Sequence, residues 1–310
     1  MEKAERIIRE VKKAVVGKDD VLNRIMMAIL AKGHVLLEDI PGVGKTTIAN
    51  AFAKAMHLDS RRMQFTIDVL PSDVVGFTVI DPVDGKAKLH KGAVFTNIFL
   101  ADEINRTTSK TQAALLEVME EGSITVDGYT QRAPSPFLVI ATQNPYGSAG
   151  TLMLPESQLD RFTISLKIGY PSASEEIEIL KRNQQGSGMS EIIPVATAQD
   201  IIAMQEECQR IYVHDKVYEY AISLVQATRN HPQVLRGASP RAGISLMQMA
   251  RANAYLHDRD FAVPSDVQEV FIDTIAHRVL VKRMAVNKSA DKEMILKGIL
   301  REVPMPRVKG

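Results

Sequence analysis

The sequence is poor in the features that mark secreted or membrane proteins. It has a single cysteine, Cys208, so no disulfide can form within the chain. No apolar run approaches the roughly 20 residues that cross a bilayer. The first residues, MEKAERIIRE, have the pattern of a charged amphipathic helix and not of a signal peptide. These absences predict a cytoplasmic protein without membrane insertion.

A strong net charge is also missing. The chain has 38 Lys and Arg residues against 37 Asp and Glu residues, a formal net charge of +1. Sequence-independent binding to nucleic acid needs a basic face, so this balance argues against a large nucleic-acid footprint. The length of 310 residues is enough for a substantial core and for two domains, and no repeat or low-complexity tract interrupts it.

The stretch VLLEDIPGVGKTTIAN, residues 35–50, has the pattern of a phosphate-binding loop between a strand and a helix. Its apolar start predicts a buried parallel strand, and Gly42 and Gly44 let the backbone approach a ligand closely. The predicted helix Thr47–Met56 would present unpaired N–H groups to an anion. Asp39 stands where the usual pattern begins with glycine, but on the strand side the need for glycine is weaker. We therefore predict nucleotide binding.

The residue types in this loop divide its chemistry. Lys45 can reach the β- and γ-phosphates, and the Thr46 hydroxyl can ligate Mg²⁺. We expect phosphate contacts from Gly42 to Thr46, with ATP or ADP and Mg²⁺ as the ligands.

A second pattern, NIFLADEINR, places Asp102 and Glu103 directly after a predicted strand, Ile98–Ala101. One carboxylate can hold Mg²⁺ while the next polarises an attacking water. Neighbouring strand residues point to opposite faces, so the pair can divide these roles only if the strand ends there, as Asn105 and Arg106 suggest. Alone, the pair could be a solvated strand end. Together with the loop it predicts an ATPase.

A third strand pattern, FLVIATQNP, runs from Phe137 to Pro145 and ends in polar residues. Asn144 could bond the γ-phosphate or the lytic water if this strand lies beside the one that leads to Glu103. Alternatively, Asn-Pro only starts a turn.

The order of these motifs resembles the MoxR family of AAA+ ATPases. The matching stretches, from about residue 15 to 250, are VVGKDD, LLEDIPGVGKT, QFTIDVLPSDVVGF, HKGAVFTNIFLADEINRTT, LLEVMEEGSITVDG, FLVIATQNP, LPESQLDRF and GASPRAGISL. Two departures are visible. Ile67-Asp68 stands where the family often has Pro-Asp, and Asp39 replaces a glycine, which looks similar to what the MoxR branch itself accepts.

The resemblance implies an α/β fold, with a P-loop AAA+ core built on a parallel sheet in three αβα layers and a C-terminal all-helical lid. It implies that Arg161 completes a neighbour's site, that Arg241 is the sensor-2 arginine, and that Arg106 is a further candidate for a contact between protomers. Whether Arg241 serves its own nucleotide or the next protomer's stays open. The expected nucleotide-binding set is Val16, Gly17, Pro41, Gly42, Val43, Gly44, Lys45, Thr46, Thr47, Asp102 and Arg241, with Glu103, Asn144, Arg161 and Arg241 in catalysis and Thr46 and Asp102 on the metal.

Patterns along the chain predict two domains, residues 1–190 and 191–310. Strands alternate with helices through Leu166, as in a covered parallel sheet. Ser174 is the expected N-cap of a helix at Glu175–Gln185, and Ser265 with Gln268 forms an expected capping box. A linker composition follows at Gly186–Pro194. The expected helices are Glu2–Val16 and Val21–Lys32 before the first strand, and Thr197–Ile211, Lys216–His231, Pro240–His257 and Pro264–Ala276 in the lid.

Two insertions interrupt the core. Ser123–Ala133 alternates around Asp127-Gly128, which predicts a β-hairpin. Thr66–Phe95 is too long for a simple connection. Its resemblance to the helix-2 insert of related ATPases indicates a loop facing the pore of a ring, with a plain surface excursion as the alternative.

The resulting hypothesis is Mg²⁺-dependent ATP hydrolysis by a homo-oligomeric ring, a hexamer, that remodels or activates a protein client. The resemblance supplies the client class and a von Willebrand factor A domain partner. A metal-chelatase motor subunit, a DNA-directed motor and a non-catalytic nucleotide-binding scaffold are alternatives. A DNA motor would need a basic pore loop or an added DNA-binding domain. The insert offers only Lys86, Lys88, His90 and Lys91, and the lid pattern shows no extra module. A scaffold would lack Glu103 or Arg161, and both are present.

Overall fold

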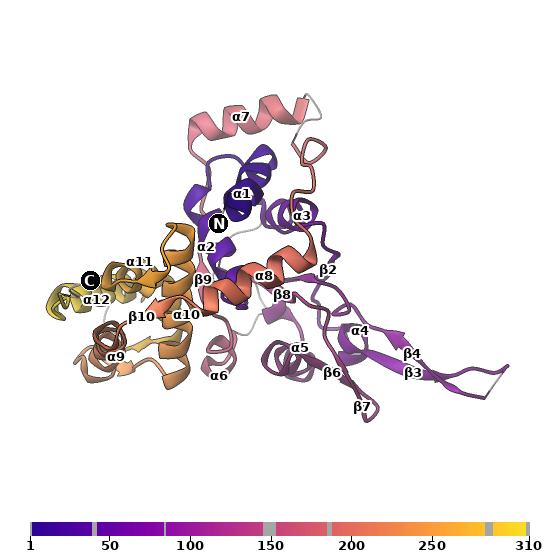
Figure 1. The fold of residues 1–310 in the computed structure, drawn as a ribbon. Coiled ribbons are helices and arrows are strands. Elements are labelled where there is room, and N and C mark those ends of the chain that lie inside the picture. Colours follow the sequence, from indigo (N-terminus) through magenta and orange to yellow (C-terminus); the bar gives the residue numbers. More distant parts are fainter. Residues whose placement is uncertain are drawn as a thin grey trace.

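Five parallel strands form the central sheet of the protein, in the order β2-β5-β8-β1-β9 (Figure 1). The computed structural model describes residues 2–38, 42–83, 85–144, 153–184, 188–282 and 288–307. The strands are β1 (Val35–Glu38), β2 (Ser60–Gln64), β5 (Ile98–Asp102), β8 (Leu138–Gln143) and β9 (Ile164–Leu166). Because all five run the same way, every carboxyl end lies at one edge of the sheet.

Helices cover both faces of the sheet, which confirms the expected three-layer core. The faces alternate along β1, where Val35 and Leu37 belong to one buried apolar cluster and Leu36 to another. The first cluster includes residues of α1 (Glu2–Ala14), α2 (Asp19–Leu30) and α3 (Lys45–Ala55), and the second includes residues of α4 (Pro71–Val75) and α5 (Ser109–Glu121).

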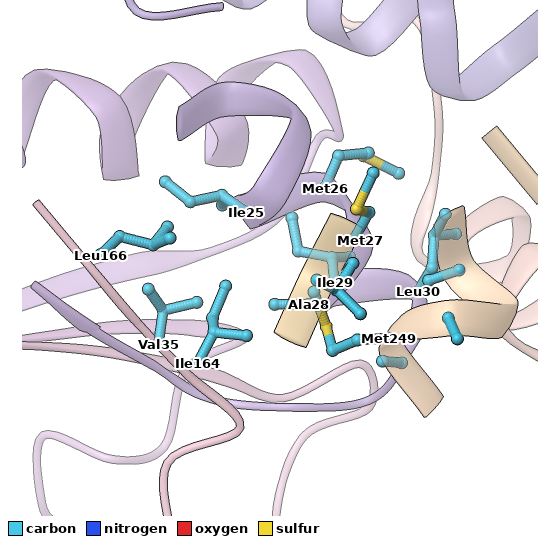
Figure 2. Close-up of a cluster of buried hydrophobic side chains, with 14 of the residues drawn as sticks. Ile25, Met26, Met27, Ala28, Ile29, Leu30, Val35, Ile164, Leu166 and Met249 are labelled. Carbon is cyan, nitrogen blue, oxygen red and sulfur yellow. The ribbon is translucent and has the colours of Figure 1, made fainter. Parts of the chain in front are cut away.

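Helix α2 joins the sheet to the C-terminal helices. Figure 2 shows its apolar side chains gathered with Val35, Ile164 and Leu166 of the strands and with Met249 of the C-terminal part. Leu22, Ile25 and other α2 side chains are fully buried. The first apolar cluster is therefore continuous from the sheet into the C-terminal region.

The C-terminal region is helical, as expected. Its helices are α8 (Ala198–Gln209), α9 (Asp215–Asn230), α10 (Pro240–Leu256), α11 (Pro264–Ile275) and α12 (Lys288–Glu302), after α7 (Ala173–Gln184). The sequence patterns missed α12 and two short strand pairs. These pairs are β10 (Tyr212–Val213) with β12 (Phe261–Ala262) and β11 (Val234–Arg236) with β13 (Leu280–Val281).

Two predicted helix caps were wrong by a few residues. Helix α7 is capped by Ser172 and not by Ser174, because the Ser172 N–H donates to the Glu175 carboxylate at 2.6 Å and the Glu175 N–H donates back to the Ser172 hydroxyl at 3.4 Å. Helix α11 begins at Pro264, where the Asp266 carboxylate accepts the Val263 N–H at 2.7 Å. Ser265 therefore lies inside the helix. In each case a carboxylate three residues after the true cap accepts the backbone N–H of the cap residue and so fixes the start of the helix there.

Each insertion contains a hairpin that projects from the core in Figure 1. The predicted hairpin is β6 (Ser123–Val126) with β7 (Tyr129–Arg132), turning at Asp127-Gly128. The longer insertion contains α4 and a second hairpin, β3 (Gly76–Ile80) with β4 (Ala87–Lys91). The Asp127 carboxylate accepts the Thr78 N–H at 2.9 Å, so the two hairpins are bonded to each other.

No helix within the described ranges is both long enough and apolar enough to cross a membrane.

His34 ties three elements together at the start of β1. Its Nδ1 accepts the Val139 N–H of β8 at 3.0 Å, and its Nε2 lies 3.0 Å from the Met119 carbonyl of α5. The two contacts suit the neutral ring with the proton on Nε2. Burial lowers the pKa of His34 from 6.5 to about 4. The folded state therefore takes up the His34 proton less readily than the unfolded chain does.

His34 should make folding sensitive to acid. Its folded-state pKa is depressed, so its contribution to stability is complete above pH 6.5 and is lost as the pH falls toward about 4. In urea titrations, His34→Gln should lose less stability than wild type over this pH range, by at most about 3 kcal/mol. His90→Gln, on an exposed strand of a hairpin, controls for the removal of a histidine. Equal acid losses in wild type and His34→Gln would contradict this role.

Candidate functional site

The loop after β1 has the backbone of a phosphate cradle. Gly42 has φ +88° and Gly44 has φ +90°, values in the left-handed region that side chains rarely adopt. Gly44 directly precedes α3, whose start carries no side-chain cap, and Lys45, Thr46 and Thr47 form the first turn. The first turn of a helix presents backbone N–H groups and partial positive charge to an anion. Val43 packs against the apolar cluster, while Asp39, Ile40 and Pro41 lie outside the described residues.

The two carboxylates lie at the end of strand β5, as expected. Strand β5 ends at Asp102, and Glu103 turns out of it with φ +55°. The Thr142 hydroxyl of β8 donates to Asp102 Oδ1 at 2.7 Å and accepts the Glu103 N–H at 2.8 Å. This one hydroxyl therefore fixes both the metal-ligand candidate and the backbone of the candidate base.

Strand β2 supplies partners that sequence reasoning missed. Arg62 Nη2 lies 2.6 Å from Asp102 Oδ2, and Gln64 Nε2 donates to Glu103 Oε2 at 2.8 Å. The pairing of Gln64 with Asp102 in the sheet register produces both contacts. A polar strand, SRRMQ, was the only hint, because strand order is needed to know what it faces.

Arg106 lies at the site of its own chain. Its Nη1 donates to Glu103 Oε2 at 2.7 Å, the same oxygen that Gln64 binds. An arginine engaged with its own Glu103 is a poorer candidate for a contact between protomers than the sequence suggested.

Asn144 lies at the same edge of the sheet. It follows β8 by one residue, and β8 lies between β1 and β5. Beside it, the buried Gln143 Nε2 donates to Glu38 Oε1 at 2.8 Å, which joins the ends of β8 and β1. The strands of Asn144 and Glu103 are neighbours, as its predicted role requires.

Val16 and Gly17 connect α1 to α2 beside the start of α7. Lys18 Nζ donates to the Tyr170 carbonyl at 3.1 Å. A Cβ placed on Gly17 would lie 1.7 Å from the Glu175 carboxylate, so this segment packs closely against α7.

Arg161 and Arg241 lie at the opposite edge of the sheet. Arg161 follows α6 (Glu156–Leu159) and precedes β9 by three residues, and the Thr163 N–H donates to the His34 carbonyl at 2.9 Å. Strand β1 then separates this point from the loop by roughly 15 Å at about 3.3 Å per residue. Arg241, in the first turn of α10, pairs with Glu120, as Arg161 does. The structure does not bring these arginines to their own loop.

The donor atoms suit Mg²⁺ that arrives with a nucleotide. The described residues contain no group of three or more His, Cys, Asp and Glu side chains that could hold a metal alone. Thr46 and Asp102 would supply one hydroxyl and one carboxylate oxygen. Mg²⁺ typically takes one or two carboxylates together with substrate phosphates and water, so this sparse set fits.

Comparisons with known proteins agree with this geometry. Residues 34–164 match the family model "ATPase family associated with various cellular activities (AAA)", and residues 226–299 match "AAA lid domain". A candidate ATPase from Cytophaga hutchinsonii has a crystal structure that aligns with a TM-score of 0.89 at 36% identity, covering 99% of this chain and 96% of that one. The fold and the site thus define an AAA+ ATPase with a lid.

Relatives narrow the family further. The chain is 38% identical to "Chaperone MoxR1" of Mycobacterium tuberculosis, over 99% of this chain and 83% of that one. It is 44% identical to "Uncharacterized protein YeaC" of Bacillus subtilis, over 97% of this chain and 94% of that one. The chain belongs to the MoxR family of AAA+ ATPases and is an ATPase.

Removing the Thr142 hydroxyl should slow hydrolysis while ATP still binds. Thr142→Val keeps the shape but leaves Asp102 Oδ1 and the Glu103 N–H without their shared partner. A misplacement of about 1 Å can cost about 100-fold in rate, so we expect a 10- to 100-fold lower kcat. Thr125→Val, which loses a hydroxyl contact on a hairpin, is the matched control. Unchanged turnover in Thr142→Val would show that this bridge is dispensable.

Proposed function

We propose that the chain hydrolyses ATP with Mg²⁺ as a subunit of a closed ring, a hexamer, and uses the energy to remodel or activate a protein client. One observation carries the proposal. The phosphate loop and the carboxylates lie at one edge of the parallel sheet, and Arg161 and Arg241 lie at the other. Head-to-tail contact of unlike edges generates rings when the rotation closes.

At the edge of the sheet where the strands end, each side chain of the site has a distinct task. The start of α3 and Lys45 would hold the phosphates, and Thr46 and Asp102 would hold Mg²⁺. Positive charge held there would neutralise charge that develops during phosphoryl transfer. Glu103 accepts a proton from the attacking water, and Asn144 orients that water or the γ-phosphate. Val16 and Gly17, with Pro41 to Thr47, complete the nucleotide contacts.

At the other edge, Arg161 and Arg241 would stabilise the phosphates of the neighbouring protomer. The separation of about 15 Å along β1 argues that Arg241 acts between protomers and not on its own nucleotide. Arg106 is bonded to Glu103 of its own chain, which leaves Arg161 as the better candidate for the trans contact.

The projecting hairpins favour a protein client. Their exposed apolar side chains are suited to polypeptide more than to a phosphate backbone, and in the ring we place them toward the pore. These side chains are Phe77, Val79, Ile80, Val83, Leu89 and Tyr129. The name "Chaperone MoxR1" of a relative agrees with such a client. We further propose a von Willebrand factor A domain partner, a cytoplasmic location, and a division of the chain into a core, residues 1–190, and a lid, residues 191–310.

Two substitutions should separate binding from chemistry. Lys45→Ala removes the charge facing the phosphates and should abolish ATP binding. Glu103→Gln keeps the shape but loses the base, so it should bind ATP and hydrolyse it slowly. Fluorescent-nucleotide binding and phosphate release measure the two properties, with Lys110→Ala on exposed α5 surface as control. Equal loss of ATP affinity in Lys45→Ala and Glu103→Gln would contradict this division of roles.

Mixing two inactive variants should restore activity if Arg161 acts on a neighbour. Arg161→Ala should bind ATP but lose most turnover, because such arginines contribute about 10³- to 10⁵-fold in rate. Mixed with Glu103→Gln, it forms interfaces where an intact Glu103 meets an intact Arg161. We expect part of the ATPase rate to return, since only some interfaces in a random ring pair correctly.

Light scattering should show that the mixture assembles and that its mass rises with ATP. A strict monomer at high protein concentration with ATP and Mg²⁺ would rule out the ring. A mixture that assembles without any recovered hydrolysis would rule out donation by Arg161.

A further inference from the structure

Glu120 is the meeting point of the two arginines at the far edge of the sheet. On the last turn of α5, its Oε2 lies 3.2 Å from Arg161 Nη1, and its Oε1 accepts a hydrogen bond from Arg241 Nη2. Arg161 belongs to the sheet-containing part and Arg241 to the C-terminal helices. A single carboxylate therefore joins guanidinium groups from two parts of the chain.

Residues close to each arginine are also joined across the same boundary. The Ser239 hydroxyl, which caps α10 two residues before Arg241, donates to the Asp160 carboxylate at 2.8 and 3.0 Å. Buried Arg278 places its Nε 3.0 Å from Asp160 and donates to the Phe162 carbonyl at 2.7 Å. These contacts join the segments that carry the two arginines, and Glu120 joins the arginine side chains themselves.

The carboxylate is needed because the two guanidinium groups repel each other. Hydrogen bonding to Arg241, together with the charges of Arg161 and Arg241, lowers the pKa of Glu120 below its usual value. Glu120 is therefore ionised at neutral pH and offsets part of the repulsion. Each guanidinium has five N–H donors, so pairing with Glu120 leaves others for a phosphate.

We propose that Glu120 is a positioning residue that aligns Arg161 and Arg241 for the nucleotide of the neighbouring protomer. The inference rests on the proposed trans action of these arginines. Glu120 itself touches no nucleotide in this scheme. It keeps the two long, half-exposed side chains side by side, so that both reach the same phosphate group without first being ordered.

The first test is the steady-state kinetics of Glu120→Gln. The loss of the negative charge should lower kcat roughly 10- to 100-fold and leave the KM for ATP within about twofold, because the loop that binds ATP is untouched. Glu121→Gln removes the next carboxylate, which contacts only Ser123 among the described side-chain contacts, and should behave as wild type. Glu120→Asp should recover part of the rate, since it restores the charge on a shorter chain.

The second test locates the defect by mixing variants. Glu120→Gln with Glu103→Gln should recover activity. The first variant supplies an intact phosphate loop and Glu103, and the second supplies intact Arg161, Arg241 and Glu120. Glu120→Gln mixed with Arg161→Ala should recover no activity, because both variants are defective in the arginines that act on the neighbouring nucleotide. A stability defect alone would not produce this pattern of partners.

The outcomes separate this inference from the proposed function. Suppose Arg161→Ala with Glu103→Gln recovers activity, but Glu120→Gln turns over as fast as Glu121→Gln. The ring mechanism then stands and the role of Glu120 is overturned. Recovered ATPase activity in a mixture of Glu120→Gln and Arg161→Ala also overturns it, because the Glu120 defect would then lie at the phosphate loop and not at the arginines. Without recovery in the Arg161→Ala and Glu103→Gln mixture, the trans mechanism itself fails, and the inference falls with it.

Discussion

The common direction of the five strands is the constraint on which the rest of the structure depends. A parallel sheet has two chemically different edges, because all strands begin at one and end at the other. The loop after β1 and the carboxylates after β5 gather where strands end. Arg161 precedes β9 and so lies where strands begin. The length of β1 separates Arg161 from the loop by roughly 15 Å, and for this reason the proposed mechanism uses a second protomer.

The C-terminal helices take part in the edge where strands begin. Helix α2 packs between the sheet and these helices, and their apolar residues form one cluster with it (Figure 2). Arg278 is buried at the same boundary, and burial lowers its pKa to about 10, which still leaves it charged at neutral pH. Its partner Asp160 lies next to Arg161. A movement of the lid would therefore also move that arginine.

Local patterns were enough to predict the groups that follow strands. The loop glycines, the Asp102-Glu103 pair and the Asp127-Gly128 turn each depend on residues close in sequence, and the structure has the expected loop, strand end and hairpin there. Thr142, Gln64 and Glu120 were missed because their importance comes from strand order and from contacts over long sequence distances. Nothing local distinguishes Glu120 from Glu121 beside it.

The errors have the same origin. Ser174 and Ser265 were predicted as caps, but the true caps lie two residues earlier. There the carboxylates of Glu175 and Asp266 accept the backbone N–H groups of Ser172 and Val263. The short strands of the lid escaped prediction because pairs of two or three residues carry no period. Helix α12 has a weak apolar stripe, and its residues Ile295, Leu296 and Ile299 are buried in the apolar cluster of the C-terminal helices.

The hydrogen bond between Asp127 and Thr78 makes the two hairpins one connected unit, which joins the core at two strands. Hairpin β6–β7 leads into the start of β8, and hairpin β3–β4 leads into the start of β5. These neighbouring strands end at Asn144 and at Asp102. A displacement of either hairpin would therefore reach both strands at their beginnings. The far ends of these strands carry the groups that we propose to position and activate the attacking water. Strands β5 and β8 thus connect the proposed client-binding hairpins to the proposed hydrolysis site.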